Sequence, residues 1–389
     1  MTILFFMLLS GCHPALQKEA VSPSEALVRV HYFYPEFPDD MDIASFEEAI
    51  TNNLRYLNRL PKDRTFSFGQ DIYGRDHMIE SQNTLLELIK TVNDPDKLRR
   101  EIKKKFNLYR ASGRTGNKKM LFTGYFEPVY NAKRSPDHEY KHPVYRLPDD
   151  LIRIDLSLFR ERYKGESIIA RVHGKEVLPY YSRMEIEDNS MLVNKGLEIA
   201  WLKDPVDVAF LHIQGSGRLR LDDETYIPVG YESSNGRAYR SLGRYLIEKG
   251  YLTREETTMQ SIRRVLSEMP EIVNDTLNYN ESYIFFRELK EGPLGNIGVP
   301  LTPGRSIALD SKLFPRGAIC FIRSERPVQD SSGEIERWHK FTRFMINQDT
   351  GGAITGAGRD DIFWGNGPYA ELAAGHMKHE GELYMLIKK

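Results

Sequence analysis

The chain has 389 residues, 40% of them hydrophobic, a length that supports a sizeable core and favours two domains over one. Its 54 Lys and Arg nearly balance 55 Asp and Glu, so no broad basic field is available to bind DNA or RNA. We expect no nucleic-acid partner. Only two cysteines, Cys12 and Cys320, and ten scattered histidines are present, so we expect neither a metal site nor another cofactor.

The N-terminus holds a short apolar run, residues 3–9, followed by LSGC ending at Cys12. The run is too short for a transmembrane helix, which needs about 20 apolar residues, but it suits a secretory signal. LSGC resembles the bacterial lipobox, which implies lipid on Cys12, although no Lys or Arg precedes the run. We expect residues 1–24 to be a lipoprotein signal peptide and tether, with a buried strand as the alternative. His13 in place of Asp favours the outer membrane.

The hydrophobic period alternates along the chain between that of helices and that of strands. Between the helical blocks, one long strand is expected over 207–221, and Cys320 lies in an apolar run typical of a buried strand. The expected order is helices over 45–60, 78–91 and 96–108, strands from 119 to about 230, helices over 235–250 and 253–270, and strands to the C-terminus.

This order predicts an α+β, mainly β chain in which one domain interrupts another. The expected units are residues 25–126 together with 236–389, and an inserted β domain over 127–235. A cleft between two such domains is where ligands usually bind.

Two motifs place polar side chains and glycines beside apolar strands. FTGYFEP holds Thr123, Tyr125 and Glu127, and HIQGSGRL holds Gln214 and Ser216. Amide and hydroxyl groups beside glycines suit sugar hydroxyls, whereas an ordinary strand-to-turn junction is the alternative for each motif. A phosphate loop is disfavoured because no Lys follows in Walker spacing.

Carboxylates lie at the ends of apolar strands near the C-terminus. Asp310 is in ALDSKLFPRG, and Asp349, Asp360 and Asp361 are in QDTGGAITGAGRDDIFWGNG. Partial desolvation raises the pKa of such a group, so that one carboxyl can act as an acid while its neighbour stays ionised. The triplet at 349–351 resembles the Asp-Thr-Gly of aspartic proteases, but pepsin-like enzymes need two triplets and this chain has one.

Several longer motifs occur in an order that resembles the membrane-bound lytic murein transglycosylase A family. They cover the chain from about residue 120 to its end, and more weakly from about 25. The resemblance implies a double-psi β-barrel, a C-terminal 3D domain named for three aspartates, and an inserted β domain, with a peptidoglycan strand in the groove between them. The motifs are FTGY, HIQGSG, YIPVGYESSNGRAYRSLGRYLIEKG, NESYIFFRE, GNIGVPLTPGRSIALDSKLFPRG and DTGGAITGAGRDDIFWGNG.

Carried over by position, the three aspartates are Asp310, Asp349 and Asp361. The resemblance implies that Asp361 is the catalytic acid/base, because it directly precedes the Ile-aromatic pair, and that Asp349 supports it. Asp360 is a departure from the pattern, and since neighbours on a strand point to opposite sides, only one of this pair can face the substrate. The residues implied to bind substrate are Thr123, Tyr125, Gln214, Ser216 and Asp310.

The implied reaction cleaves the β-1,4 bond between N-acetylmuramic acid and N-acetylglucosamine and forms a 1,6-anhydromuramoyl product. A non-catalytic peptidoglycan-binding lipoprotein and a lysozyme-like hydrolase are the alternatives. We expect a monomer whose partners are glycan strands, the membrane reached through its N-terminal lipid, and other wall-remodelling proteins, in the outer membrane facing the periplasm.

Overall fold

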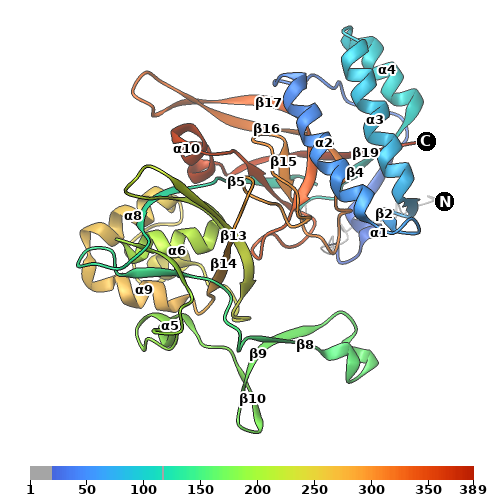
Figure 1. The fold of residues 1–389 in the computed structure, drawn as a ribbon. Helices are drawn as coiled ribbons and strands as arrows, with labels where there is room; N and C mark the ends of the chain where they lie inside the picture. The colour runs from blue at the N-terminus through green and yellow to red at the C-terminus, as the bar shows by residue number, and fades with distance from the viewer. Residues whose placement is uncertain (1–19, 116–117) are drawn as a thin grey trace, which may run out of the picture.

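The computed structural model describes residues 20–115 and 118–389. The expected lipid site, Cys12, and most of the segment 1–24 lie outside the described residues. The described chain is a mixed α+β structure, as expected, in which strands from both ends of the chain share one sheet (Figure 1). Within those ranges, we find no helix that is both long and apolar enough to cross a membrane.

A closed barrel joins strands from the two ends of the chain. Within the described residues its ring order is β19 (His379–Lys388), β16 (Ile319–Gln329), β17 (Ile335–Asp349), β15 (Ser306–Ala308), β18 (Arg359–Phe363) and β5 (Met120–Tyr125), and pairing of β5 with β19 closes the ring. β15 is parallel to β17, and β18 is parallel to β5. β4 (Phe106–Ala111) and then β1 (Leu27–Val30) extend the sheet from β19.

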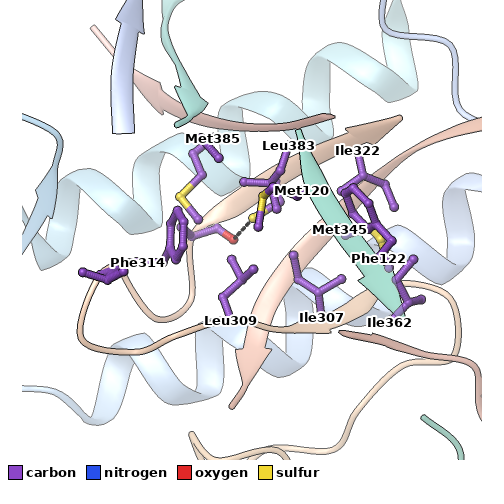
Figure 2. Close-up of a cluster of buried hydrophobic side chains, with 14 of the residues drawn as sticks. Met120, Phe122, Ile307, Leu309, Phe314, Ile322, Met345, Ile362, Leu383 and Met385 are labelled. Atoms are coloured by element: carbon purple, nitrogen blue, oxygen red, sulfur yellow. Dashed lines mark hydrogen bonds between the residues drawn. The ribbon is translucent and has the colours of Figure 1, made fainter. Parts of the chain in front are cut away.

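Apolar side chains fill the interior of this barrel (Figure 2). Phe122 of β5, Ile307 of β15 and Ile362 of β18 are each fully buried. Burying a side chain of this size contributes about 1.5–3 kcal/mol, so this cluster is the main support of the ring. Cys320 lies in the same cluster and is fully buried, which matches its expected role as a small apolar residue.

The N-terminal helices α2 (Ile43–Arg59), α3 (Arg75–Thr91) and α4 (Pro95–Lys105) pack together on one side of the barrel (Figure 1). α2 begins before Ser45, the expected start, because the side chain of Asp42 caps it by accepting a hydrogen bond from the Ser45 N–H. α4 ends before residue 108, since the next residues pair with β19 as β4. The short elements of this region are α1 (Pro23–Ala26), β2 (Thr65–Phe68) and β3 (Asp71–Gly74).

Strands from the middle of the chain form separate sheets. Among the described residues, one sheet has the order β14 (Ile284–Glu288), β13 (Tyr226–Ser234), β12 (Ser216–Arg220), β6 (Val129–Lys133), β11 (Glu198–Leu202) and β7 (His142–Tyr145). A second has the order β10 (Glu176–Pro179), β9 (Ser167–His173) and β8 (Ile152–Asp155), and it projects away from the rest of the molecule (Figure 1). The remaining helices are α5 (Arg183–Glu187), α6 (Pro205–Gln214), α7 (Leu242–Glu248), α8 (Met259–Glu268), α9 (Val273–Tyr279) and α10 (Pro368–His376).

The first of these sheets continues beyond residue 235, the expected end of the insertion. β14 follows that position by about fifty residues and pairs antiparallel with β13 along its whole length. We propose on this ground that the inserted unit runs from about residue 127 to about residue 288.

The prediction of one strand over 207–221 is wrong, because its first half is the helix α6. Asp204 caps the helix by accepting from the Val206 N–H, Pro205 occupies the first turn, and Gly215 ends it with φ 75°. These are standard helix start and stop signals, and the apolar run between them is buried on several sides rather than on one face. α7 and α8 likewise start later than expected, at Leu242 and Met259, after the caps Ser241 and Thr258.

Candidate active site

Asp360 and Asp361 are adjacent on β18, and their positions in this strand determine which of them faces outward. Asp360 pairs with Phe122 of β5 and is fully buried in the barrel, whereas Asp361 pairs with Thr123 and is only partly buried. Successive side chains of a strand point to opposite faces. Asp361 is therefore the member of the pair whose side chain lies on the outer face of the strand.

The carboxyl group of Asp361 is held by its neighbour on β5. Thr123 Oγ1 donates a hydrogen bond of 2.7 Å to Asp361 Oδ1. Burial raises the pKa of Asp361 to about 6, while the Thr123 hydrogen bond and the charge of Arg359 oppose the rise and the charge of Asp349 adds to it. Near neutral pH this carboxyl exchanges a proton readily, as a general acid/base requires.

Asp349, at the end of β17, is held at both carboxylate oxygens. Tyr125 Oη donates to Oδ2 at 2.8 Å, and the backbone N–H groups of Asn296 and Thr350 donate to Oδ1 at 2.9 Å each. Burial raises the pKa of Asp349, and these three hydrogen bonds act against that rise by favouring the carboxylate. Thr123 and Tyr125 are two residues apart on β5, so they present their hydroxyls on the same face.

The two carboxylates are brought together by the short central strand β15. Its residue Ala308 pairs with Asp349 on β17 and with Asp361 on β18. Neighbouring strands lie about 4.8 Å apart, so the two backbones are separated by roughly 10 Å, with both side chains above Ala308. The residue between the two carboxylates in this pairing is thus a small one, Ala308.

Asp310 does not join this pair. Its carboxylate accepts hydrogen bonds from the backbone N–H of Lys312 at 2.9 Å and of Gly356 at 2.8 Å. Gly356 belongs to the glycine-rich loop that connects Asp349 to Asp361, so Asp310 fixes that loop. The substrate-binding role that the resemblance implies for Asp310 stays a prediction, and its two oxygens are already engaged in the fold.

Asp360 has no visible chemical role in the site. Its two carboxylate oxygens are buried and have no hydrogen-bond partner among the residues that the structure describes. Burial, with a smaller contribution from the charge of Asp361, raises the pKa of Asp360 well above its usual range. The group is therefore neutral and sits among apolar neighbours that include Cys320.

Gln214 and Ser216 lie where helix α6 turns into strand β12. Gln214 Oε1 accepts from the backbone N–H of Phe126 at 3.2 Å, and so joins α6 to the segment that follows β5. Ser216 is buried at the start of β12 and pairs with Gly230. The amide of Gln214 is in contact with the chain carrying Thr123 and Tyr125, whereas the structure gives Ser216 no hydrogen-bonded side-chain partner in the described residues.

Two groups that act on the carboxylates, Asn296 and Arg359, and one further buried carboxylate, Glu127, were not among the site residues predicted from the sequence. The Asn296 N–H, which binds Asp349, comes from a loop whose Gly295 must be glycine because a Cβ there would lie 2.4 Å from the Gln348 carbonyl oxygen. Arg359 precedes the aspartate pair on β18. Glu127, in the FTGYFEP motif, is 2% exposed and pairs with Arg218 at 2.9 Å.

No group of three or more His, Cys, Asp and Glu within residues 20–115 and 118–389 is arranged to hold a metal ion. The site instead consists of two carboxylates, two hydroxyls and backbone N–H groups. Such a set can donate and accept protons and can bind sugar hydroxyls.

Comparison with known proteins defines the class of this chain. Residues 121–287 match the MltA specific insert domain, and residues 305–387 match the 3D domain. The chain is thus a 3D-domain protein with the MltA-type insert. It belongs to the membrane-bound lytic murein transglycosylase A family.

Curated relatives of that name support the assignment. The Vibrio cholerae protein is 33% identical over 270 residues, which are 69% of this chain and 65% of the relative. The Escherichia coli K12 protein is 30% identical over 268 residues, which are 68% of this chain and 65% of the relative. The matches therefore span slightly less than two thirds of the length of either relative.

Solved structures agree with the fold. A membrane-bound lytic murein transglycosylase from Agrobacterium tumefaciens has a TM-score of 0.71 at 28% identity, covering 92% of this chain and 98% of that one. MltA from Neisseria gonorrhoeae has a TM-score of 0.71 at 29% identity, covering 97% and 96%. Escherichia coli MltA with bound chitohexaose has the same fold, with a TM-score of 0.71 at 24% identity over 95% and 97% of the two chains.

Proposed function

We propose that the chain is a peptidoglycan lytic transglycosylase with Asp361 as its single general acid/base. The observation that carries this proposal is the partly buried carboxyl of Asp361, with a pKa of about 6, on the outer face of a barrel strand. A second carboxylate, Asp349, lies across β15 from it. Membership of the transglycosylase family supports peptidoglycan as the substrate of this carboxyl pair.

In the first step, protonated Asp361 donates its proton to the oxygen of the β-1,4 bond between N-acetylmuramic acid and N-acetylglucosamine. The bond from muramoyl C1 to that oxygen breaks, and positive charge develops at C1 and the ring oxygen. The raised pKa of Asp361 supports this role, because an ordinary aspartate is almost fully ionised at neutral pH.

In the second step, the carboxylate of Asp361 takes the proton from the C6 hydroxyl of the same muramoyl ring. The C6 oxygen bonds to C1 and closes a 1,6-anhydro bridge, and no water is consumed. Asp361 ends the cycle protonated, ready for another strand. One residue acts as both acid and base, as the principle of microscopic reversibility allows.

Asp349 is proposed to support the acid electrostatically. Its negative charge raises the pKa of Asp361, so it favours the protonated form before bond cleavage and favours the positive charge that develops at C1. Three hydrogen bonds, from Tyr125, Asn296 and Thr350, keep Asp349 in place.

The substrate is proposed to lie in a groove between a double-psi type barrel and the inserted unit. Thr123, Tyr125 and Ser216 are proposed to line this groove, with Gln214 and Asp310 shaping it through the hydrogen bonds described above. The mixed parallel and antiparallel pairing in the closed ring supports the barrel type. The chitohexaose found in the Escherichia coli protein of the same fold supports a polysaccharide ligand.

We further propose that lipid on Cys12 anchors a monomeric enzyme in the outer membrane, facing the periplasm, where it reaches glycan strands and wall-remodelling proteins. The support is the LSGC sequence and the names of the relatives, which are called membrane-bound. Two or more acyl chains are needed for stable anchoring, and a lipidated cysteine supplies them.

Mass spectrometry of the products of digested sacculi tests the reaction. Products that end in 1,6-anhydromuramic acid, 18 Da lighter than the corresponding reducing ends by the mass of one water, support the transglycosylase. Reducing ends would show a hydrolase in which Asp349 activates water, and the absence of products would favour a non-catalytic binder.

A further inference from the structure

A second concave site lies in the inserted unit, and none of the carboxylates described above belongs to it. It is a cavity of about 610 Å³ between β7, α5, β11 and the start of α6. Apolar side chains form much of its wall, among them Ile186, Val193, Trp201 and Val208. A volume of this size holds a small molecule or a short peptide.

Tyr145 presents a free hydroxyl to the cavity. The residue is 2% exposed and lines the cavity, and its hydroxyl makes no hydrogen bond with any residue that the structure describes. The hydroxyl oxygen is not one of the fully buried atoms without a partner, so it is reached from the cavity and is available to a ligand.

Two carboxylates accompany this hydroxyl. Glu198 pairs with Tyr145 across the β7–β11 ladder, and its side chain makes no hydrogen bond or ion pair with another described residue. Glu187 forms an ion pair with Arg183, in which Glu187 Oε1 lies 2.9 Å from Arg183 Nη1, and the Arg183 side chain is 1% exposed. Burial, with the charges of Glu198 and Glu187, raises the pKa of Tyr145 to about 12, so its hydroxyl keeps its proton.

The charge of this end is negative. Arg183 offsets Glu187, while Glu198 is not offset by any described cation. Lys141 also lines the cavity, and it lies four residues before Tyr145 along a nearly extended chain, so the two backbones are separated by up to about 13 Å. A peptide of three residues spans roughly 10 Å. The cavity thus has the length and the charge pattern of a short peptide with opposite charges at its ends.

We propose that this cavity binds a short peptide whose free amino group lies against Glu198, Glu187 and Tyr145 and whose free carboxylate faces Lys141. The peptide that fits is a stem peptide of peptidoglycan containing a diamino acid, an identification that rests on the proposed function. Such a site binds the stem peptide of the substrate while the glycan of the same substrate lies against Asp349 and Asp361.

Isothermal titration calorimetry on the full chain tests the site. The probes are the synthetic tripeptide N-acetyl-L-Ala-γ-D-Glu-L-Lys, whose N-terminus is an amide as it is on a glycan strand, and the same tripeptide with its Lys amino group acetylated. We expect the free form to bind at least 10-fold more tightly, because acetylation removes the charge that Glu198 would pair with. Equal affinity for the two forms, or no binding of the free form, would overturn the proposal.

Two variants assign the effect to the cavity. Glu198→Gln keeps the shape of the side chain and should abolish the preference for the free form. Tyr145→Phe removes only the hydroxyl and should weaken the preference for the free form several-fold. Glu176→Gln on β10 is the matched control, because Glu176 is exposed and does not line the cavity, and it should keep the preference. Unchanged preference in Glu198→Gln, with a thermal midpoint equal to that of wild type, contradicts the proposal.

Digestion of purified sacculi by the wild-type chain separates this inference from the proposed function. If anhydro products are released and the tripeptide is not bound, the peptide site is wrong and the transglycosylase stands. If the tripeptide is bound with the stated preference and no products are released from sacculi, the peptide site stands and the proposed function is wrong.

Discussion

Asp349 and Asp361 lie opposite the same residue, Ala308, on the two sides of strand β15. Twelve positions separate them in sequence, and the glycine-rich loop between them is fixed by Asp310 through the N–H of Gly356. The barrel therefore positions both carboxylates through backbone pairing, which is more rigid than a loop. This rigidity is what lets one carboxylate adjust the pKa of the other.

The first prediction concerns pH. Asp361 must be protonated to start the reaction, so kcat/KM should be high below pH 6 and fall as pH rises through about 6. Thr123→Val removes a hydrogen bond that lowers the pKa of Asp361. The falling limb of the pH profile of kcat/KM should therefore move to higher pH. Thr91→Val, on helix α3, is the control and should leave the limb in place. A limb at lower pH in Thr123→Val would contradict the assignment.

The second prediction concerns Asp349. Asp349→Asn retains an oxygen for the N–H groups of Asn296 and Thr350, but it removes the charge that raises the pKa of Asp361. We expect the falling limb of the pH profile of kcat/KM to shift to lower pH and kcat to drop by about 10²–10³-fold, the usual range for loss of one electrostatic stabiliser. Steady-state kinetics on soluble glycan strands measure both effects. A lower kcat with an unmoved limb would show that Asp349 acts in another way.

The third prediction concerns Asp360. Its pKa is raised in the folded state, so its stabilising contribution is complete below the unfolded pKa near 3.9 and is lost as pH rises toward the folded value. Asp360→Asn should therefore gain stability relative to wild type as pH rises from 4.5 to 8, by at most about 1.4 kcal/mol per pH unit, the limit for one proton. Urea unfolding at the two pH values measures the gain. Parallel pH dependence in the two proteins would refute the interior placement.

The fourth prediction concerns the loop between the carboxylates. Asp310→Ala deletes the acceptor of two backbone N–H groups, so it should destabilise the chain by about 1–3 kcal/mol and speed hydrogen exchange at Lys312 and Gly356. Asp330→Ala, which removes a comparable turn acceptor on the surface hairpin between β16 and β17, is the control. Exchange at Gly356 that does not differ between the variants would rule out the anchoring role.

The sequence allowed some of this site to be predicted, because the decisive pattern is local. The family resemblance is confirmed. The alternation of side chains along a strand predicts that only one of Asp360 and Asp361 can face outward, and the resemblance indicates Asp361. The mixed α+β class is also confirmed. It could be predicted because hydrophobic periodicity is a short-range signal.

Other parts depend on long-range pairing and were missed or misplaced. Nothing near β15 indicates that Ala308 separates two carboxylates, and nothing near residue 235 indicates that β14 joins the inserted sheet. The strand expected over 207–221 shows a different failure. Its apolar residues fit either element, whereas the cap residues that identify the helix are Asp204, before the expected strand, and Gly215, in its middle.

The release of anhydromuropeptides from purified sacculi by matched Asp361→Asn and Asp360→Asn variants tests the central claim most directly. Asn keeps the size of either side chain and removes its proton chemistry, so both variants should fold. We predict no anhydro products above the blank for Asp361→Asn, and release within a few-fold of wild type for Asp360→Asn. Release at the wild-type rate by Asp361→Asn would contradict the account.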